Sequence, residues 1–161
     1  MKLYHGSNLQ VKSPRLLEKQ RNLDFGSGFY LTTSKQQAKN WAIYKANRFH
    51  GEAILSIFEI DETFFSQLNV KQYHSPTVEW LDMISNFRMG KSHEDDFDLI
   101  IGPVADDGTM DVLQSYFLGI LKPEQAIENL MTFKLKDQYV FKTTKALKLL
   151  TFIGGENVGT N

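Results

Sequence analysis

The chain has 161 residues, 42% of them hydrophobic and 23% charged, with a formal net charge of −1; these values are ordinary for a soluble globular protein and provide no overall attraction to nucleic acid. Cysteine is absent, which excludes disulfides, thiolate catalysis and cysteine-ligated metals. Because no apolar run approaches the roughly 20 residues of a membrane span and the N-terminus lacks an apolar signal region, we expect a cytoplasmic protein with no membrane partner.

The first half of the chain predicts strands separated by one long helix. Runs of apolar residues favour strands at 2–6, 28–33 and 53–60, and the last run is apolar at nearly every position, as in a strand covered on both faces. Ser34 is a suitable N-cap for a helix at 36–49. The helical spacing in that segment is carried by Ala38, Trp41, Ala42 and Lys45.

The second half predicts three helices mixed with four more strands. Pro76 suits the start of a helix, and Trp80, Phe87, Phe117 and Phe133 are expected in the core. In chain order, the elements expected here are a strand at 68–73, the helix after Pro76, a strand at 98–102, helices at 110–120 and 123–132, and strands at 137–142 and 147–153.

Strands and helices follow one another without regular βαβ alternation, which favours an α+β fold with helices packed on a largely antiparallel sheet. A dinucleotide-binding Rossmann fold is disfavoured, because Gly26-Ser27-Gly28 lacks a third glycine and precedes a strand. We expect one domain at 1–154 and a flexible tail at 155–161. The acidic segment at 93–96 is expected to be a solvated loop, and no metal site is assigned.

Three short segments carry a family resemblance. Tyr4-His5-Gly6-Ser7 resembles the first motif of the diphtheria-toxin and poly(ADP-ribose) polymerase branch of ADP-ribosyltransferases, in which a His-Gly pair ends the first strand. The segment 25–30, Phe-Gly-Ser-Gly-Phe-Tyr, resembles the second motif, and Trp41 falls where the family has its second stacking aromatic. The segment 137–141, Asp-Gln-Tyr-Val-Phe, resembles the third motif. A Gly-Pro-Val-Ala-Asp-Asp run at 102–107 is similar to an uncharacterised group of small bacterial proteins placed in that superfamily.

The resemblance implies an ADP-ribosyltransferase fold with a split sheet, and NAD+ as the substrate. His5 would bond a ribose hydroxyl, Gly6 would pair through its backbone with the nicotinamide carboxamide, and Tyr30 and Trp41 would enclose the pyridinium ring. The implied NAD+-binding residues are Tyr4, Gly6, Ser7, Arg15, Gly28, Tyr30 and Trp41, with Arg15 directed at the pyrophosphate. The implied catalytic residues are His5, Tyr30, Gln138, Asp106 and Asp107.

Gln138 departs from the family pattern, in which a glutamate stands at this position. A glutamine keeps a hydrogen bond to ribose but loses the charge that stabilises an oxocarbenium ion, a loss that typically costs about 10²-fold or more in rate. Asp106 and Asp107, just beyond an apolar strand, are the candidates for supplying that charge. Asp137 is a poor substitute because adjacent strand residues face opposite sides.

The implied activity is mono-ADP-ribosyl transfer to an unknown protein, nucleic acid or small-molecule acceptor, in a bacterial toxin or effector with an antitoxin partner. NAD+ hydrolysis and a catalytically inert NAD+- or ADP-ribose-binding or protein-interaction module remain open alternatives. Structural interpretations also remain open for the individual residues. His5 would then be a hydrogen-bonded structural histidine, Tyr30 and Trp41 core aromatics, the two glycines turn residues and Gln138 an ordinary strand residue.

Overall fold

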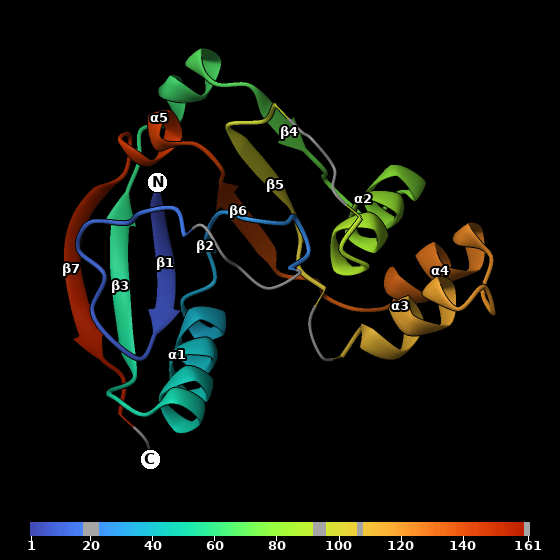
Figure 1. The fold of residues 1–161 in the computed structure, drawn as a ribbon, viewed down its shortest axis with the longest axis horizontal. Coiled ribbons are helices and arrows are strands. Elements are labelled where there is room, and N and C mark those ends of the chain that lie inside the picture. The colour runs from blue at the N-terminus through green and yellow to red at the C-terminus, as the bar shows by residue number, and fades with distance from the viewer. Residues whose placement is uncertain (18–22, 92–95, 106–107, 160–161) are drawn as a thin grey trace.

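The protein folds into two β-sheets with helices on both sides (Figure 1). The computed structural model describes residues 1–17, 23–91, 96–105 and 108–159. The first sheet has the order β1-β3-β7, formed by Lys2–Ser7, Ile54–Glu59 and Thr151–Asn157. The second has the order β2-β6-β5-β4, formed by Phe29–Leu31, Asp137–Phe141, Leu99–Pro103 and Val70–Gln72.

The two sheets meet at one isolated bridge between Tyr4 and Thr32. Two backbone hydrogen bonds form it, from Tyr4 N to Thr32 O at 2.9 Å and from Thr32 N to Tyr4 O at 3.1 Å. All strand pairs are antiparallel except β4 with β5, which is parallel. The α+β class is therefore confirmed, with one antiparallel and one mixed sheet.

Helix α1 packs against the first sheet, and three more helices gather beyond the second (Figure 1). No helix in the described part of the chain is long and apolar enough to cross a membrane. The helices are α1 at Lys35–Phe49, α2 at Val78–Arg88, α3 at Met110–Phe117, α4 at Pro123–Leu130 and the short α5 at Thr144–Leu147, with a 3₁₀ helix at Glu62–Gln67.

Local capping explains where the helices begin. Ser34 accepts a hydrogen bond from the backbone N–H of Gln37, as expected of the N-cap of α1. Helix α2 begins one step later than expected, because Thr77 rather than Pro76 provides its cap and accepts from Trp80 N at 3.1 Å. A threonine hydroxyl satisfies a free N–H in the first turn, which proline does not do.

Two large apolar clusters, with a small one around Ala42, Ala46 and Ala53, form the core of the described chain. One lies between the sheets and includes Leu3, Phe29, Phe58 and Phe141; the other lies between the second sheet and the helices around Trp80. The expected burial of Phe87 is confirmed, whereas Phe117 is half-buried and Phe133 is 41% exposed. Phe133 lies beyond the end of α4, outside the apolar layer that the helix covers.

The C-terminal strand differs from its expected position. Residues 144–147 form α5, and β7 begins only at Thr151. β7 then continues to Asn157, which pairs with Ile54, so the expectation of a flexible tail from residue 155 is wrong as far as residue 157. Exposed and half-buried residues alternate along β7, and the ladder with β3 keeps the strand in place despite its two glycines.

A close approach between β1 and α1 requires a glycine at position 6. A Cβ built on Gly6 would lie 1.9 Å from Ala38 O and 2.8 Å from Ala42 N, both of which are backbone atoms of the helix. The small residues Ala38 and Ala42 are buried where α1 contacts β1. The helix therefore rests directly on the strand, and the position of α1 relative to β1 is fixed by the absence of a side chain.

We expect Gly6→Ala to lower the free energy of unfolding by about 3 kcal/mol, because the backbone of α1 must move to admit the methyl group. Gly154→Ala is the matched control, since a Cβ there meets nothing within 4 Å, and its effect should stay within about 0.5 kcal/mol. Urea denaturation measures both. Equal stabilities of the two variants would contradict the close contact.

Candidate functional site

The three motif segments lie on three strands that are neighbours in space. Tyr4-His5-Gly6-Ser7 ends β1, the segment 25–30 leads into β2, and the segment 137–141 is β6. The β1–β2 contact is the bridge between the sheets, and β2 pairs with β6 with Tyr30 opposite Val140. Segments more than 100 residues apart in sequence therefore meet where the sheet splits.

His5 is held from both sides by the start of β2. Its Nδ1 lies 2.8 Å from the carbonyl oxygen of Tyr30, and its ring stacks on Phe29 with the centroids 4.5 Å apart. A carbonyl oxygen only accepts, so Nδ1 carries the proton. In the neutral ring Nε2 is then an acceptor, and no described residue occupies it.

The environment keeps His5 neutral. Burial and, to a smaller extent, the positive charge of Lys45 lower the pKa of His5 from 6.5 to about 4, although the bond to Tyr30 acts in the opposite direction. At neutral pH the imidazole is therefore an oriented hydrogen-bond acceptor rather than a cation.

The backbone of Gly6 faces the split. In antiparallel pairing alternate residues turn their N–H and C=O to opposite edges, so Gly6 shares the edge that Tyr4 uses to bond Thr32. The carbonyl oxygen of Gly6 accepts a hydrogen bond from Lys45 Nζ at 3.0 Å. Burial lowers the pKa of this ammonium. Lys45 thus places a cation at the edge that the resemblance assigns to the carboxamide.

Tyr30 is fixed by the loop that precedes it. Its hydroxyl donates to Gly26 O at 2.7 Å and accepts from Phe25 N at 3.1 Å. Both loop glycines have structural reasons: Gly26 has a φ of +71°, and a Cβ on Gly28 would lie 2.5 Å from Val140 Cγ1. The loop therefore holds the Tyr30 ring half-buried at the start of the second sheet.

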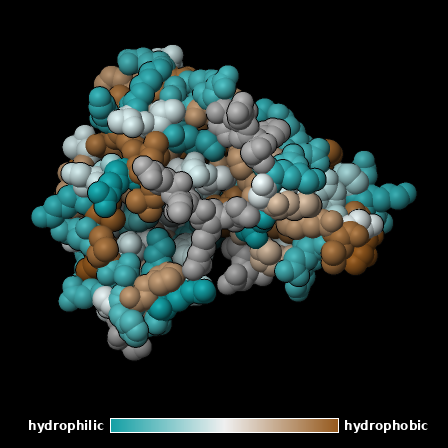
Figure 2. Space-filling model, viewed as in Figure 1, coloured by the Kyte–Doolittle hydropathy of each residue, from teal (hydrophilic) through white to brown (hydrophobic). Residues whose placement is uncertain are grey.

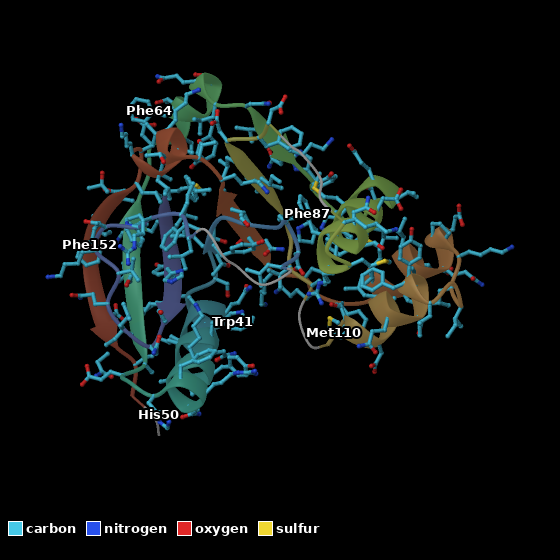
Figure 3. All side chains as sticks on the ribbon, in the orientation of Figure 1. Trp41, His50, Phe64, Phe87, Met110 and Phe152 are labelled. Carbon is cyan, nitrogen blue, oxygen red and sulfur yellow. The ribbon has the colours of Figure 1, made fainter. Side chains whose placement is uncertain are left out.

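Trp41 lies on the side of α1 that faces the second sheet (Figure 3). It is 48% exposed, and its ring packs edge-on against Tyr44 with the centroids 5.4 Å apart. Trp41 precedes Lys45 by one helical turn, and the contact of Lys45 with Gly6 brings this side of the helix to the split. Trp41 has Tyr44 as its neighbouring ring, and the enclosure of a planar ligand between Tyr30 and Trp41 stays a prediction.

Gln138 is buried in a polar cluster. Its Nε2 donates to Asp24 Oδ2 at 3.0 Å and to Pro103 O at 3.2 Å. The other carboxylate oxygen of Asp24 pairs with Arg88, whose Nε lies 2.7 Å away, and Ala105 N donates to Oδ2 at 3.0 Å. Gln138 and Val140 project from the same face of β6, and Val140 pairs with Tyr30 of β2. The three side chains therefore share one face of the second sheet.

The other residues predicted from the sequence have fewer contacts with the residues described above. Tyr4 is half-buried and shares the face of Gly6, Ser7 is 8% exposed at the end of β1, and Arg15 is exposed with no partner among the described residues. Asp106 and Asp107 lie outside the described residues. Asp137 bonds Thr32 and Thr33, so it is occupied at the end of β2 as the strand alternation predicts.

Hydrophobic side chains gather at the end of the molecule that carries α3 and α4 (Figure 2). A pocket of about 370 Å³, lined among others by Tyr73, His74 and Asp137, contains none of the predicted residues. Among the described residues no group of three or more histidines or carboxylates is arranged to hold a metal.

Sequence reasoning missed three charged residues of this region. Asp24 precedes the two glycines without a motif of its own, and Arg88 is only a basic residue in the last turn of α2. Lys45 was predicted as part of the packed side of α1, but its contact with Gly6 was not. The one available signal was its spacing of four residues from Trp41, which places both on one side of the helix.

The low pKa of His5 couples its protonation to folding. The unfolded chain takes up this proton near pH 6.5 and the folded chain only near 4, so stability falls as pH drops through that window, by up to about 3 kcal/mol. We expect His5→Asn to flatten this part of the pH profile of the unfolding free energy, measured with urea. The exposed His74 provides the control His74→Asn, which should retain the wild-type slope. An unchanged slope in His5→Asn would refute the assignment.

Comparison with models of protein families gives a match. A family model described as "Protein of unknown function (DUF3990)" matches residues 1–152. No curated protein and no solved structure matches the chain. Because the match covers most of the 161 residues, including β1, β2 and β6, the chain belongs to the DUF3990 family of proteins of unknown function.

Proposed function

We propose that the protein is an NAD+-dependent mono-ADP-ribosyltransferase with the split-sheet fold of that superfamily. The observation that carries the proposal is the meeting of the three motif segments on β1, β2 and β6, with His5 bonded to the backbone of Tyr30. The likeness of each motif concerns only a few residues. Their spatial adjacency adds support because the motifs lie far apart in the sequence.

The hydrogen-bonding character of the site supports a ribose ligand. Nε2 of the neutral His5 is an acceptor with no partner in the described part of the chain. Gln138 uses both of its N–H donors on protein acceptors, which leaves its oxygen as the group available to a ligand. Hydroxyl groups are the complementary donors, and a ribose offers two adjacent ones.

The proposed reaction breaks the bond between C1′ of ribose and the pyridinium nitrogen of NAD+. The bonding electrons pass to that nitrogen, so nicotinamide leaves neutral and an oxocarbenium ion develops on the ribose. A nucleophilic atom of the acceptor then bonds C1′ and releases its proton. Tyr30 and Trp41 would hold the ring, and His5 and Gln138 the ribose hydroxyls.

Two further candidates follow from Gln138. Water in place of another acceptor gives NAD+ hydrolysis to ADP-ribose, and a site without a carboxylate near C1′ also suits a module that binds NAD+ or ADP-ribose without turnover. The acceptor in the leading proposal is a protein, nucleic acid or small molecule. A bacterial toxin with a cognate antitoxin is the proposed biological setting.

We expect the purified protein to release nicotinamide from NAD+ and Trp41→Ala to lower kcat/KM about 10-fold, the equivalent of about 1.4 kcal/mol of ring stacking. Trp41 is half exposed, so its removal should leave the fold intact. Phe49→Ala is the matched control, because Phe49 is a similarly exposed aromatic at the far end of the same helix. Chromatography of nicotinamide measures the rate.

The products separate the candidates. ADP-ribose attached to an added acceptor, detected by mass spectrometry, supports transfer, whereas free ADP-ribose alone supports hydrolysis. NAD+ binding by calorimetry without nicotinamide release supports the inert module. Neither binding nor release would contradict all three.

A further inference from the structure

Gln138 of β6 belongs to a buried polar cluster around Asp24. This cluster has more hydrogen-bonding groups than Gln138 would need if it were only a structural residue of the strand. Asp24 and Gln138 are 6% and 5% exposed, and they come from the loop before β2 and from β6. Arg88 of α2 donates to Asp24 and, through Nη2, to Ala105 O at 3.1 Å. The Asp24 carboxylate and the Arg88 guanidinium thus join four segments of the chain: the loop before β2, α2, the residues after β5, and β6.

The chemistry of the partners fixes the orientation of the Gln138 amide. A backbone carbonyl and a carboxylate paired with arginine both accept hydrogen bonds, so the NH₂ group must face Asp24 and Pro103. The flipped amide would place an oxygen against two acceptors. Asp24 therefore decides which end of the amide points inward.

The amide oxygen points away from the cluster. No described residue donates to Oε1 of Gln138, and no fully buried side-chain oxygen or nitrogen in the described chain lacks a partner, so Oε1 retains access to solvent. It projects from the same sheet face as Tyr30. A side chain that is 5% exposed thus has one acceptor without a donor among the described residues, on the face of the second sheet that carries Tyr30.

We propose that Asp24 is a positioning residue that locks Gln138 with its oxygen outward, so that Gln138 accepts a hydrogen bond from a ligand hydroxyl. With the proposed NAD+ activity, on which this assignment of the ligand rests, the hydroxyl belongs to the nicotinamide ribose. The ion pair with Arg88 balances the charge of Asp24. The cluster therefore provides orientation, and the ribose is held by a neutral acceptor in place of the family's carboxylate.

The lock is testable without any ligand. In the ¹⁵N-labelled protein, the side-chain amide protons of Gln138 should exchange with solvent at least about 10-fold more slowly than those of the exposed Gln72. The isosteric Asp24→Asn should remove this protection while thermal unfolding confirms that the variant is folded. Rapid exchange in the wild type, or unchanged protection in Asp24→Asn, would overturn the proposal.

A pH profile tests the role of the oxygen. The carboxyl introduced by Gln138→Glu faces Asp24, with Arg88 behind it, and the Pro103 carbonyl. It should mimic the amide only when protonated, so the affinity for NAD+ relative to wild type, measured by calorimetry, should fall about 10-fold per pH unit above its apparent pKa. The control Gln72→Glu, with the same charge change at the exposed last residue of β4, should show no such fall. A pH-independent gain in Gln138→Glu would overturn the lock.

The two proposals fail differently. A wild type that neither binds NAD+ nor releases nicotinamide refutes the proposed function, and with it the assignment of the hydroxyl to NAD+ ribose. The amide-exchange experiment still decides whether Asp24 positions Gln138. An active wild type with an unprotected Gln138 amide refutes the positioning role alone.

Discussion

The architecture depends on the pair of backbone hydrogen bonds between Tyr4 and Thr32. They join the two sheets at one point, beyond which β1 and β2 diverge. A continuous ladder would satisfy the backbone of Gly6 within the sheet. Because the ladder stops, peptide groups at the end of β1 face away from β3 at the junction, where the proposed ligand would take the place of a strand partner.

The surroundings of this junction are rigid for identifiable reasons. Gly6 allows α1 to lie directly on β1, and the Tyr30 hydroxyl ties the loop before β2 to its own strand. Asp24 and Arg88 connect the same loop to α2 and to the end of β5. The acceptors proposed at His5 and Gln138 would depend on this support, because a hydrogen-bonding group contributes most when its orientation is fixed before the ligand arrives.

Local sequence signals predicted most of the secondary structure. The strand 53–60 and the helix 36–49 were correct to within a residue or so, since each has a strong apolar pattern and Ser34 marks the start of the helix. The strand at 147–153 was misplaced because Leu149 and Leu150 look like its centre, although they follow α5 and pack on the core between the sheets. Long-range pairing with β3, which local periodicity cannot report, sets the true position of β7.

The sequence predicted only those residues of the candidate site that lie within a short motif. The positions of His5, Gly6 and Tyr30 followed from short patterns, and the adjacency of their strands agrees with the order of the motifs. The contact between Asp24 and Gln138 spans 114 residues, and nothing local distinguishes Asp24 from a surface carboxylate. The enclosing arrangement of Tyr30 and Trp41 remains a prediction for the ligand-bound state.

The contact of Lys45 with Gly6 has a consequence for small molecules that target this region. The ammonium already occupies the carbonyl oxygen that an incoming amide would use, so a neutral amide competes with an internal donor. A compound that carries a carboxylate next to a planar ring would instead recruit Lys45 as a counter-ion while its ring rests on the indole one helical turn away. Acidic aromatic fragments are therefore the rational first ligands for a binding test of the proposed site.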